Sequence, residues 1–347
     1  MGRKVRIGIT RDLFDKDGKS ISPGPGPKVL DEMPNVEWEL FPEYLPEVSP
    51  EQARSFDMVI SFAPKWTPRT FAGNDQLLAI LRGGVGYDMV DVPACTNAGV
   101  ALFIVPPAVR RPVATGIMTF ILALSTRLRT KDKLAREGRW EAGRQCSGEG
   151  LTGKTLGSFG VGNIGHEMFK LAKPFGMKHI AHDPYIKQAA VDDVDVKLVD
   201  MDMVLTESDF VNISCPLNEQ TRHLISEKEL RKMKKTAFLI NTARGPIVDE
   251  AALIKALQEG WIQGAGIDVF EQEPNPPDNP LLKLENVIVT THSICLTDEF
   301  YITMWQEIAQ QIVQMIRGEK PIKLVNPEVW DKPEFQAKLK KFHEAIK

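Results

Sequence analysis

The fold is decided by residues 155–183, which read TLGSFGVGNIGHEMFKLAKPFGMKHIAHD. A short apolar run ends at Phe159, and apolar residues then recur with helical periodicity as far as Gly176. A second apolar run ends on the carboxylate of Asp183. Between the first run and the helix stand three glycines in G-x-G-x-x-G spacing, Gly160, Gly162 and Gly165. This order predicts a strand–turn–helix–strand unit that binds a dinucleotide, with Asp183 on the adenosine ribose.

Each of the three glycines has a predicted role. Gly160 permits the tight turn, Gly162 lets the backbone approach a pyrophosphate, and Gly165 lets the helix pack close to the strand. Free N–H groups at the start of the helix then bind the negative charge. Glycines also occur in ordinary turns, but the strand before, the helix after and the acid eighteen residues beyond Gly165 favour the dinucleotide site.

Length and composition narrow the class of protein. A chain of 347 residues predicts two domains, and 43% hydrophobic with 26% charged residues is typical of a soluble globular protein. A net charge of -3 gives no electrostatic footprint for nucleic acid or an anionic membrane, so neither partner is expected. The four cysteines form no C-x-x-C pair or zinc spacing, which favours the reducing cytoplasm and no metal site.

Short apolar runs predict two parallel sheets. Before residue 105 they alternate with polar or helical connections, which indicates a small open α/β sheet with strands near 5–9, 38–41, 58–62, 77–81 and 101–105. After Asp183 the alternation resumes with runs at 210–214, 237–242, 265–270 and 287–291. Together with the first two strands of the dinucleotide unit, these runs predict at least six parallel strands in one doubly wound sheet.

Two long helices are predicted outside the dinucleotide unit. We expect the first to start at Pro112 and to run over residues 113–128, out of the first domain. The second covers residues 297–317 and ends at Gly318, and the tail beyond it is expected to pack on an existing domain. The Pro/Gly-rich residues 22–27 predict a rigid surface loop, or the border of a ligand cleft.

Three ionisable residues follow neighbouring predicted strands. Arg244 follows the run that ends at residue 242, Glu273 follows the run that ends at residue 270, and His292 follows Thr291. Ligands of open α/β sheets bind beyond the carboxyl ends of the strands. The sequence therefore predicts that the three side chains share the sheet edge that binds the cofactor pyrophosphate.

This set of residues suits hydride transfer to a 2-oxo acid. An arginine can bind the substrate carboxylate and polarise its carbonyl, and a histidine can supply the proton as the hydride arrives. A carboxylate beside the histidine favours the imidazolium. The glycine-rich residues 82–88 offer a second anion site through their backbone N–H groups, although a plain glycine turn explains them almost as well.

Four strings in this order, GSFGVGNIG, INTARGPIVDEAAL, AGIDVFEQEP and VTTHS, resemble the D-isomer-specific 2-hydroxyacid dehydrogenase family. The similarity extends from about residue 77 to residue 320. It implies that Arg244, Glu273 and His292 are catalytic. It also implies that the substrate is bound by two of these residues, Arg244 and His292, together with backbone groups of Gly84, Val85 and Gly86 in the glycine-rich loop.

The resemblance also implies the architecture and the cofactor. We expect two Rossmann-like domains with doubly wound parallel sheets: a flavodoxin-like substrate-binding domain, residues 1–104 and 298–347, and an inserted NAD-binding domain, residues 105–297. Members of the family are usually homodimers through the cofactor domains. The expected cofactor-binding residues are Gly160, Gly162, Asn163, Ile164, Gly165, Asp183, Cys215, Pro216, Thr221, Ala243, Asp268 and Ser293.

The sequence departs from the family pattern near the predicted site. Thr291 stands where proline is usual, Ile294 where glycine or alanine is common, and Cys295 and Leu296 where aromatic or small residues are frequent. In the long apolar helix, the departing residues are Thr115 and Gly116, which replace a common Glu-His or Glu-Asn pair. These changes leave the substrate open, and the sequence offers no account of the helix pair.

Two other functions compete with the 2-hydroxyacid dehydrogenase. A formate dehydrogenase-like enzyme is disfavoured, because that branch carries glutamine where Glu273 stands. An NAD(H)-sensing protein, like the corepressor relatives of the family, remains open because such relatives can keep the catalytic residues. A metal site at His292 and Cys295 is not predicted, because two ligands do not hold zinc.

Two smaller features concern specificity. Asp183 predicts NAD over NADP, because its carboxylate would repel a 2′-phosphate and residues 184–186 supply no arginine to offset it. Arg110 and Arg111 lie near a predicted helix start, where positive charge is disfavoured. They are interpreted either as a solvated or dimer-interface pair, or as the site of a second anionic group on the substrate.

Overall fold

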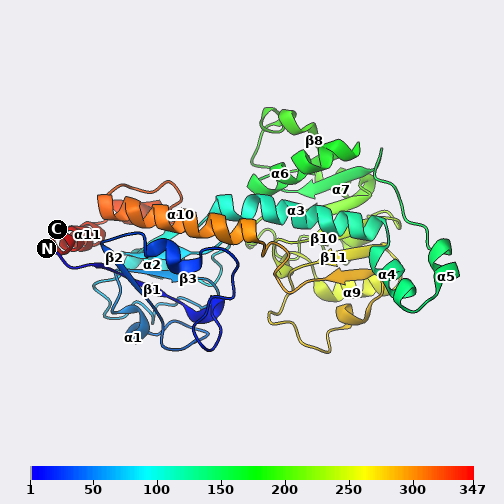
Figure 1. Cartoon of the computed structure of the whole chain (residues 1–347). Helices are drawn as coiled ribbons and strands as arrows, with labels where there is room; N and C mark the ends of the chain where they lie inside the picture. Colours follow the sequence, from blue (N-terminus) through cyan, green and yellow to red (C-terminus); the bar gives the residue numbers. More distant parts are fainter. Residues whose placement is uncertain (1) are drawn as a thin grey trace. The chain divides into compact units, whose positions relative to one another are not determined.

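The computed structural model describes residues 2–347 and divides the chain into two compact units. Unit 1 combines Met1–Val109 with Leu296–Lys347, and unit 2 is Arg110–Cys295. Each unit contains one sheet in which all neighbouring strands are parallel (Figure 1). The predicted fold class, two doubly wound parallel-sheet domains, is confirmed.

The sheet of unit 1 has the strand order β2-β1-β3-β4-β5. This is the flavodoxin-like order, in which the chain direction across the sheet reverses between β1 and β3. The strands are Val5–Ile9 (β1), Val36–Leu40 (β2), Met58–Ser61 (β3), Ala79–Arg82 (β4) and Ala101–Phe103 (β5). The helices are Pro50–Ala53 (α1), Val92–Asn97 (α2), Asp298–Arg317 (α10) and Pro333–Ile346 (α11), with 3-10 turns at Arg11–Leu13, Gly26–Leu30 and Pro327–Asp331.

Helix α10 and the tail complete unit 1 much as the sequence predicts. Thr297 caps the start of α10 through its side chain, and Gly318 ends the helix with φ 73°, a left-handed conformation that glycine adopts without strain. The tail packs on β5 through Asn326, which is 1% exposed. Its side chain accepts the Leu102 N–H at 2.9 Å and donates to the Val100 carbonyl at 3.0 Å.

The sheet of unit 2 has seven strands in the order β12-β11-β10-β9-β6-β7-β8. This is the Rossmann order, with the change of direction between β6 and β9. The strands are Thr155–Phe159 (β6), Lys178–His182 (β7), Val196–Leu198 (β8), Phe210–Ile213 (β9), Phe238–Asn241 (β10), Gly264–Ile267 (β11) and Val287–Val289 (β12). The sequence analysis did not predict β8, a three-residue strand at the end of the sheet.

The helices of unit 2 cover both faces of its sheet. They are Pro106–Ser125 (α3, which begins in unit 1), Leu128–Arg136 (α4), Trp140–Gln145 (α5), Asn163–Ala172 (α6), Met201–Glu207 (α7), Glu227–Leu230 (α8) and Glu250–Gln258 (α9). Short 3-10 turns are Lys173–Phe175, Gln188–Ala190, Asp192–Val194, Gly245–Ile247 and Pro280–Lys283. One core joins α7, α8 and α9 to Ala265 and Ile267 of β11. The alternate residue Gly266 instead contacts Phe120 of α3, so α3 covers the opposite face.

The predicted start of α3 is wrong. The helix begins at Pro106, and Pro112 lies inside it. Pro106 is equally suited to a first helical position, and Pro112 removes one N–H donor without ending the helix. By length and composition α3 could cross a membrane, but most of it is buried within the structure, as in the core helix of a soluble protein.

The Asn326 contacts give a test of how the tail is held. Asn326→Ala should leave the buried Leu102 N–H without its partner, remove one of the hydrogen bonds to the Val100 carbonyl, and lower the unfolding free energy by about 1–3 kcal/mol. Chemical denaturation followed by circular dichroism measures this change. The exposed Asn97→Ala is the control, expected within about 0.5 kcal/mol of the wild type. Equal stability of the two variants would contradict the role of Asn326.

Candidate active site

Of the three glycines in the turn of unit 2, one leaves open space for a cofactor. Gly160 has φ 92°, and a Cβ there would lie 2.8 Å from the Ser214 carbonyl oxygen. A Cβ at Gly165 would lie 2.9 Å from the carbonyl oxygen of Gly160. At Gly162, the N-cap of α6, a Cβ would have no neighbour within 4 Å. The open space above a helix N-terminus fits the pyrophosphate of a dinucleotide.

Asp183 lies beside this turn, as expected. Its Oδ2 accepts the Val161 N–H at 2.9 Å, and its Oδ1 accepts the Tyr185 N–H at 3.0 Å. Burial, with the negative charge of Asp183 adding to it, raises the pKa of the Cys215 thiol to about 11. The structure thus brings the glycine turn, Asp183 and Cys215 together at the carboxyl ends of β6, β7 and β9. The thiol is protonated at neutral pH and is not a nucleophile.

Most of the other predicted cofactor residues lie in loops at the carboxyl ends of strands. Thr221 donates through Oγ1 to the Pro216 carbonyl at 2.6 Å, which closes the loop after β9. Ala243 follows β10, and its N–H donates to the Asn241 side chain at 3.0 Å. Asn163 and Ile164 form the first turn of α6.

Arg244, Glu273 and His292 follow β10, β11 and β12, as the sequence predicts. The Arg244 loop packs closely on the loop after β11, because a Cβ at Gly245 would lie 1.9 Å from the Phe270 carbonyl oxygen. Glu273 accepts the Phe270 N–H at 3.0 Å through Oε1. Its Oε2 lies 2.8 Å from Nδ1 of His292.

The surroundings of Glu273 favour its ionised form. Burial acts to raise the pKa of Glu273, but its hydrogen bond to His292, the charge of that imidazolium, the Phe270 N–H and the charge of Arg244 together lower the pKa below its ordinary value. The carboxylate therefore remains charged at neutral pH. Because the pKa is lowered, the stability that the ionised group contributes is lost only as the pH falls through its folded-state pKa.

Asp268, predicted as a cofactor residue, organises the loop that presents His292. The Asp268 side chain is buried after β11. Its Oδ1 accepts the Thr290 hydroxyl at 2.6 Å and the N–H groups of Ser293 and Ile294 at 2.9 and 3.1 Å. Its carbonyl accepts the His292 N–H at 2.7 Å. The sequence analysis missed this role, although a buried acid directly after a strand was a signal for it.

The predicted substrate amides belong to unit 1. Gly84 follows β4, and its carbonyl accepts the Val105 N–H at 3.0 Å. No group among residues 2–347 accepts a hydrogen bond from the backbone amides of Val85 and Gly86. The structure describes this loop within unit 1 and the predicted catalytic trio within unit 2.

The structure gives Arg110 and Arg111 a partner that the sequence did not reveal. Nη1 of Arg111 lies 2.7 Å from Oε1 of Glu167 in α6, and Nε of Arg110 lies 3.9 Å from Oε2. The hydrogen bond from Arg111 is the largest cause that lowers the pKa of Glu167. The pair therefore joins α3 to α6, which accounts for its position without a substrate.

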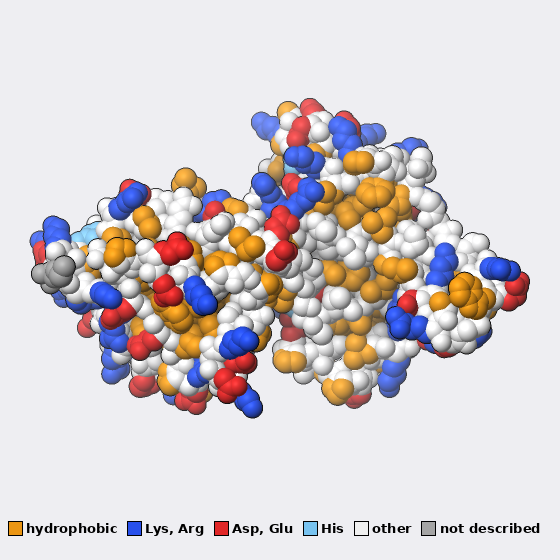
Figure 2. Space-filling model, viewed as in Figure 1, with side chains coloured by type: hydrophobic (Ala, Val, Ile, Leu, Met, Phe, Trp, Pro, Cys, Tyr) orange, Lys and Arg blue, Asp and Glu red, His pale blue; other side chains and the backbone are white. Residues whose placement is uncertain are grey.

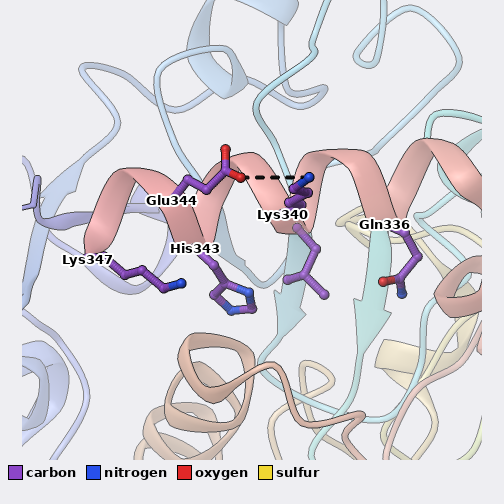
Figure 3. A pocket seen from close by; sticks show the side chains of 6 residues that line it. Gln336, Lys340, His343, Glu344 and Lys347 are labelled. Carbon is purple, nitrogen blue, oxygen red and sulfur yellow. Dashed lines mark ion pairs between the residues drawn. The ribbon is translucent and has the colours of Figure 1, made fainter.

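Two surface hollows in unit 1 contain none of the predicted site residues. One, of about 330 Å³, lies on α11 beside Lys340, His343 and Glu344 (Figure 3). The other, of about 460 Å³, lies between α2 and the segment around Phe71. Neither is a candidate for the predicted chemistry.

Known proteins resemble the chain over most of its length. It is 36% identical over 333 residues to a glyoxylate reductase of Korarchaeum cryptofilum, a match that covers 94% of this chain and 97% of that protein. A D-3-phosphoglycerate dehydrogenase of Methanocaldococcus jannaschii is 38% identical over 270 residues, which cover 78% of this chain and 51% of that protein.

Solved structures agree with these matches. A glyoxylate reductase from Paecilomyes thermophila superposes with a TM-score of 0.79 at 27% identity, over 94% of this chain and 99% of that one. A D-lactate dehydrogenase from Aquifex aeolicus, complexed with NAD and lactic acid, has a TM-score of 0.79 at 25% identity, over 90% of this chain and 96% of that one.

The family match falls on unit 2 and includes the catalytic histidine predicted from the sequence. Residues 118–293 match the family described as D-isomer specific 2-hydroxyacid dehydrogenase, NAD binding domain. This stretch begins within α3 and contains the glycine turn and the trio. The chain therefore belongs to the D-isomer-specific 2-hydroxyacid dehydrogenase family, and it is an NAD-dependent oxidoreductase of 2-hydroxy acids.

Proposed function

We propose that this enzyme reduces a small 2-oxo acid, with glyoxylate the first candidate, and that Arg244, Glu273 and His292 carry the chemistry. The observation on which this rests is the 2.8 Å contact between His292 Nδ1 and Glu273 Oε2, beside the loop of Arg244. The named activity of the glyoxylate reductases that match the chain supports the substrate.

The three residues divide the work as follows. Arg244 binds the substrate carboxylate and polarises the carbonyl. The amides of Val85 and Gly86 in unit 1 are proposed as further donors to a carboxylate. When bound, NADH supplies the hydride that the carbonyl carbon accepts. Since Nδ1 of His292 contacts Glu273, Nε2 is the ring nitrogen that gives its proton to the carbonyl oxygen. The ionised Glu273 stabilises the imidazolium until that transfer.

The pairing of Glu273 with His292 also separates the proposal from its alternatives. An enzyme that oxidises formate needs no proton acceptor, so a carboxylate paired with a histidine favours reduction of a carbonyl. An NAD(H)-sensing protein needs no such pair. Loss of NADH absorbance with a panel of 2-oxo acids distinguishes a catalyst from a sensor, which would bind NADH without turnover.

Replacement of His292 tests the proton donor. His292→Ala should lower kcat on the best 2-oxo acid by at least about 100-fold, with NADH affinity largely unchanged. A matched control exists in His223, which has φ 51° against 55° for His292 and lies 2.7 Å from Glu271. His223→Ala should keep most of the turnover. Near-normal turnover of His292→Ala, or an equal loss in both variants, would refute the assignment.

We also propose that Asp183 selects NAD by binding the adenosine ribose. Asp183→Asn keeps the size of the side chain and one of the two acceptor oxygens for the Val161 and Tyr185 N–H groups, but removes the charge. Relief of a repulsion worth about 1–4 kcal/mol should strengthen NADPH binding by at least about fivefold. Titration of cofactor fluorescence measures this without turnover, with Asp192→Asn as the control. An unchanged ratio of the NADH and NADPH affinities would contradict the role of Asp183.

We further propose that the enzyme acts in the cytoplasm as a homodimer formed by unit 2, without nucleic-acid or membrane partners. The support for the compartment is that the chain's four cysteines are free. The support for the dimer is apolar exposure around α4 and α5, where Leu128 is 57% and Trp140 is 72% exposed. Figure 2 shows hydrophobic side chains on this segment.

The oligomeric state can be measured directly. Sedimentation equilibrium at micromolar concentration should give twice the mass of the chain, and Trp140→Glu should increase the monomer fraction, because a charge at a dimer contact is desolvated on association. Ile322→Glu changes a 90% exposed apolar residue of unit 1 and is the control. A monomeric wild type would rule out the dimer, and an equal effect of both substitutions would rule out this surface.

A further inference from the structure

Two of the departures from the family pattern lie against each other. Gly116 is buried within α3, and Ile294 is the second residue after His292. A Cβ at Gly116 would lie 2.7 Å from Cγ1 and 3.0 Å from Cγ2 of Ile294. The Ile294 side chain thus occupies the space that Gly116 leaves open because it has no side chain.

Helix formation does not explain the glycine. Glycine inside a helix is destabilising by roughly 0.5–1 kcal/mol relative to alanine. Gly116 does not have the positive φ that would exclude other residues. The remaining constraint at this position is space, and the atoms that limit the space belong to Ile294.

One turn later, α3 makes a second contact of this kind, in which the helix supplies the large side chain and the strand supplies the glycine. A Cβ at Gly266 of β11 would lie 2.7 Å from Cγ of Phe120, one turn after Gly116. The helix therefore receives a side chain at Gly116 and inserts one at Phe120, on the same face. Together these contacts fix α3 against both β11 and the loop that follows β12.

Asp268 holds the backbone of the loop that contains His292 and Ile294. His292 has φ 55°, a conformation that is uncommon for a residue with a Cβ. The Ser293 and Ile294 N–H groups bind Asp268 Oδ1 at 2.9 and 3.1 Å. Asp268 thus holds the backbone on one side of the turn, and Gly116 receives the side chain of Ile294.

We infer that Ile294, seated on Gly116, is a positioning residue for His292. It fixes the turn so that the imidazole keeps Nδ1 on Glu273. The inference rests on the proposed function in one respect, namely that His292 exchanges the proton with the substrate. The contact itself explains why both departures occur in one chain.

The test is a double-mutant cycle. Gly116→Ala inserts a Cβ that Ile294 must avoid, and misplacement by about 1 Å can cost 100-fold in rate, so kcat should fall by at least about tenfold. Ile294→Ala removes Cγ1 and Cγ2, which leaves only its Cβ near residue 116, at 3.4 Å from the new methyl position. The double variant should therefore recover at least about threefold in kcat over Gly116→Ala, which is the non-additivity expected of residues in contact.

Three measurements separate positioning from general stability. The pH dependence of kcat should change in Gly116→Ala and return towards the wild type in the double variant, while NADH affinity stays constant in both. Thermal unfolding shows whether each variant is folded. Thr119→Ala is the control, because that residue is exposed on α3 and its hydroxyl donates to the Thr115 carbonyl of the same helix. It should leave kcat and its pH dependence unchanged.

The inference is overturned if folded Gly116→Ala keeps the wild-type kcat and pH profile, or if the double variant is as impaired as Gly116→Ala. If Gly116→Ala does not fold, Ile294→Ala alone decides, since it introduces no clash and should still lower kcat and change the pH profile. If the wild type reduces no 2-oxo acid, the proposed function fails. In that event the His292 imidazole signals in NMR judge the inference: they should change in Gly116→Ala and be restored in the double variant.

Discussion

The hydrogen bonds that Asp268 accepts are the interaction on which the candidate active site depends. A buried carboxyl group is costly unless its oxygens are hydrogen-bonded, and the turn at His292 is costly unless its N–H groups find acceptors. Each satisfies the other, through the Ser293 and Ile294 N–H groups and the Thr290 hydroxyl. The uncommon backbone of His292 is thereby held in place, and its imidazole meets Glu273 at 2.8 Å.

The parallel sheet makes this arrangement possible because the carboxyl ends of adjacent strands meet at one edge. Close packing there requires residues without side chains. Gly245 lets the Arg244 loop lie on the Phe270 carbonyl, and Gly266 lets Phe120 of α3 approach β11. The guanidinium, the carboxylate and the imidazole therefore come from three separate strands, but their loops form one packed layer.

Much of the architecture was predictable from the sequence because buried parallel strands are apolar runs that end at turns. The strand β8 was not, because it has three residues with exposed Lys197 at its centre. The start of α3 was mispredicted because proline suits a first helical position at both Pro106 and Pro112, and only the structure distinguishes them. The trio was predicted from its places after strands, whereas the role of Asp268 depends on hydrogen bonds that no spacing reveals.

The pair Gly116 and Ile294 shows why departures from a family pattern are poorly judged one at a time. Taken singly, a glycine in a core helix suggests a weakened helix, and a branched residue beside the proposed catalytic histidine suggests a blocked site. In contact, the side chain of Ile294 fills the space that Gly116 leaves open. Dense packing is therefore preserved by the two changes together, whereas either change alone would disturb it. Changes beside His292 are thus consistent with an active enzyme whose catalytic loop is supported from α3 by Ile294 and held at its backbone by Asp268.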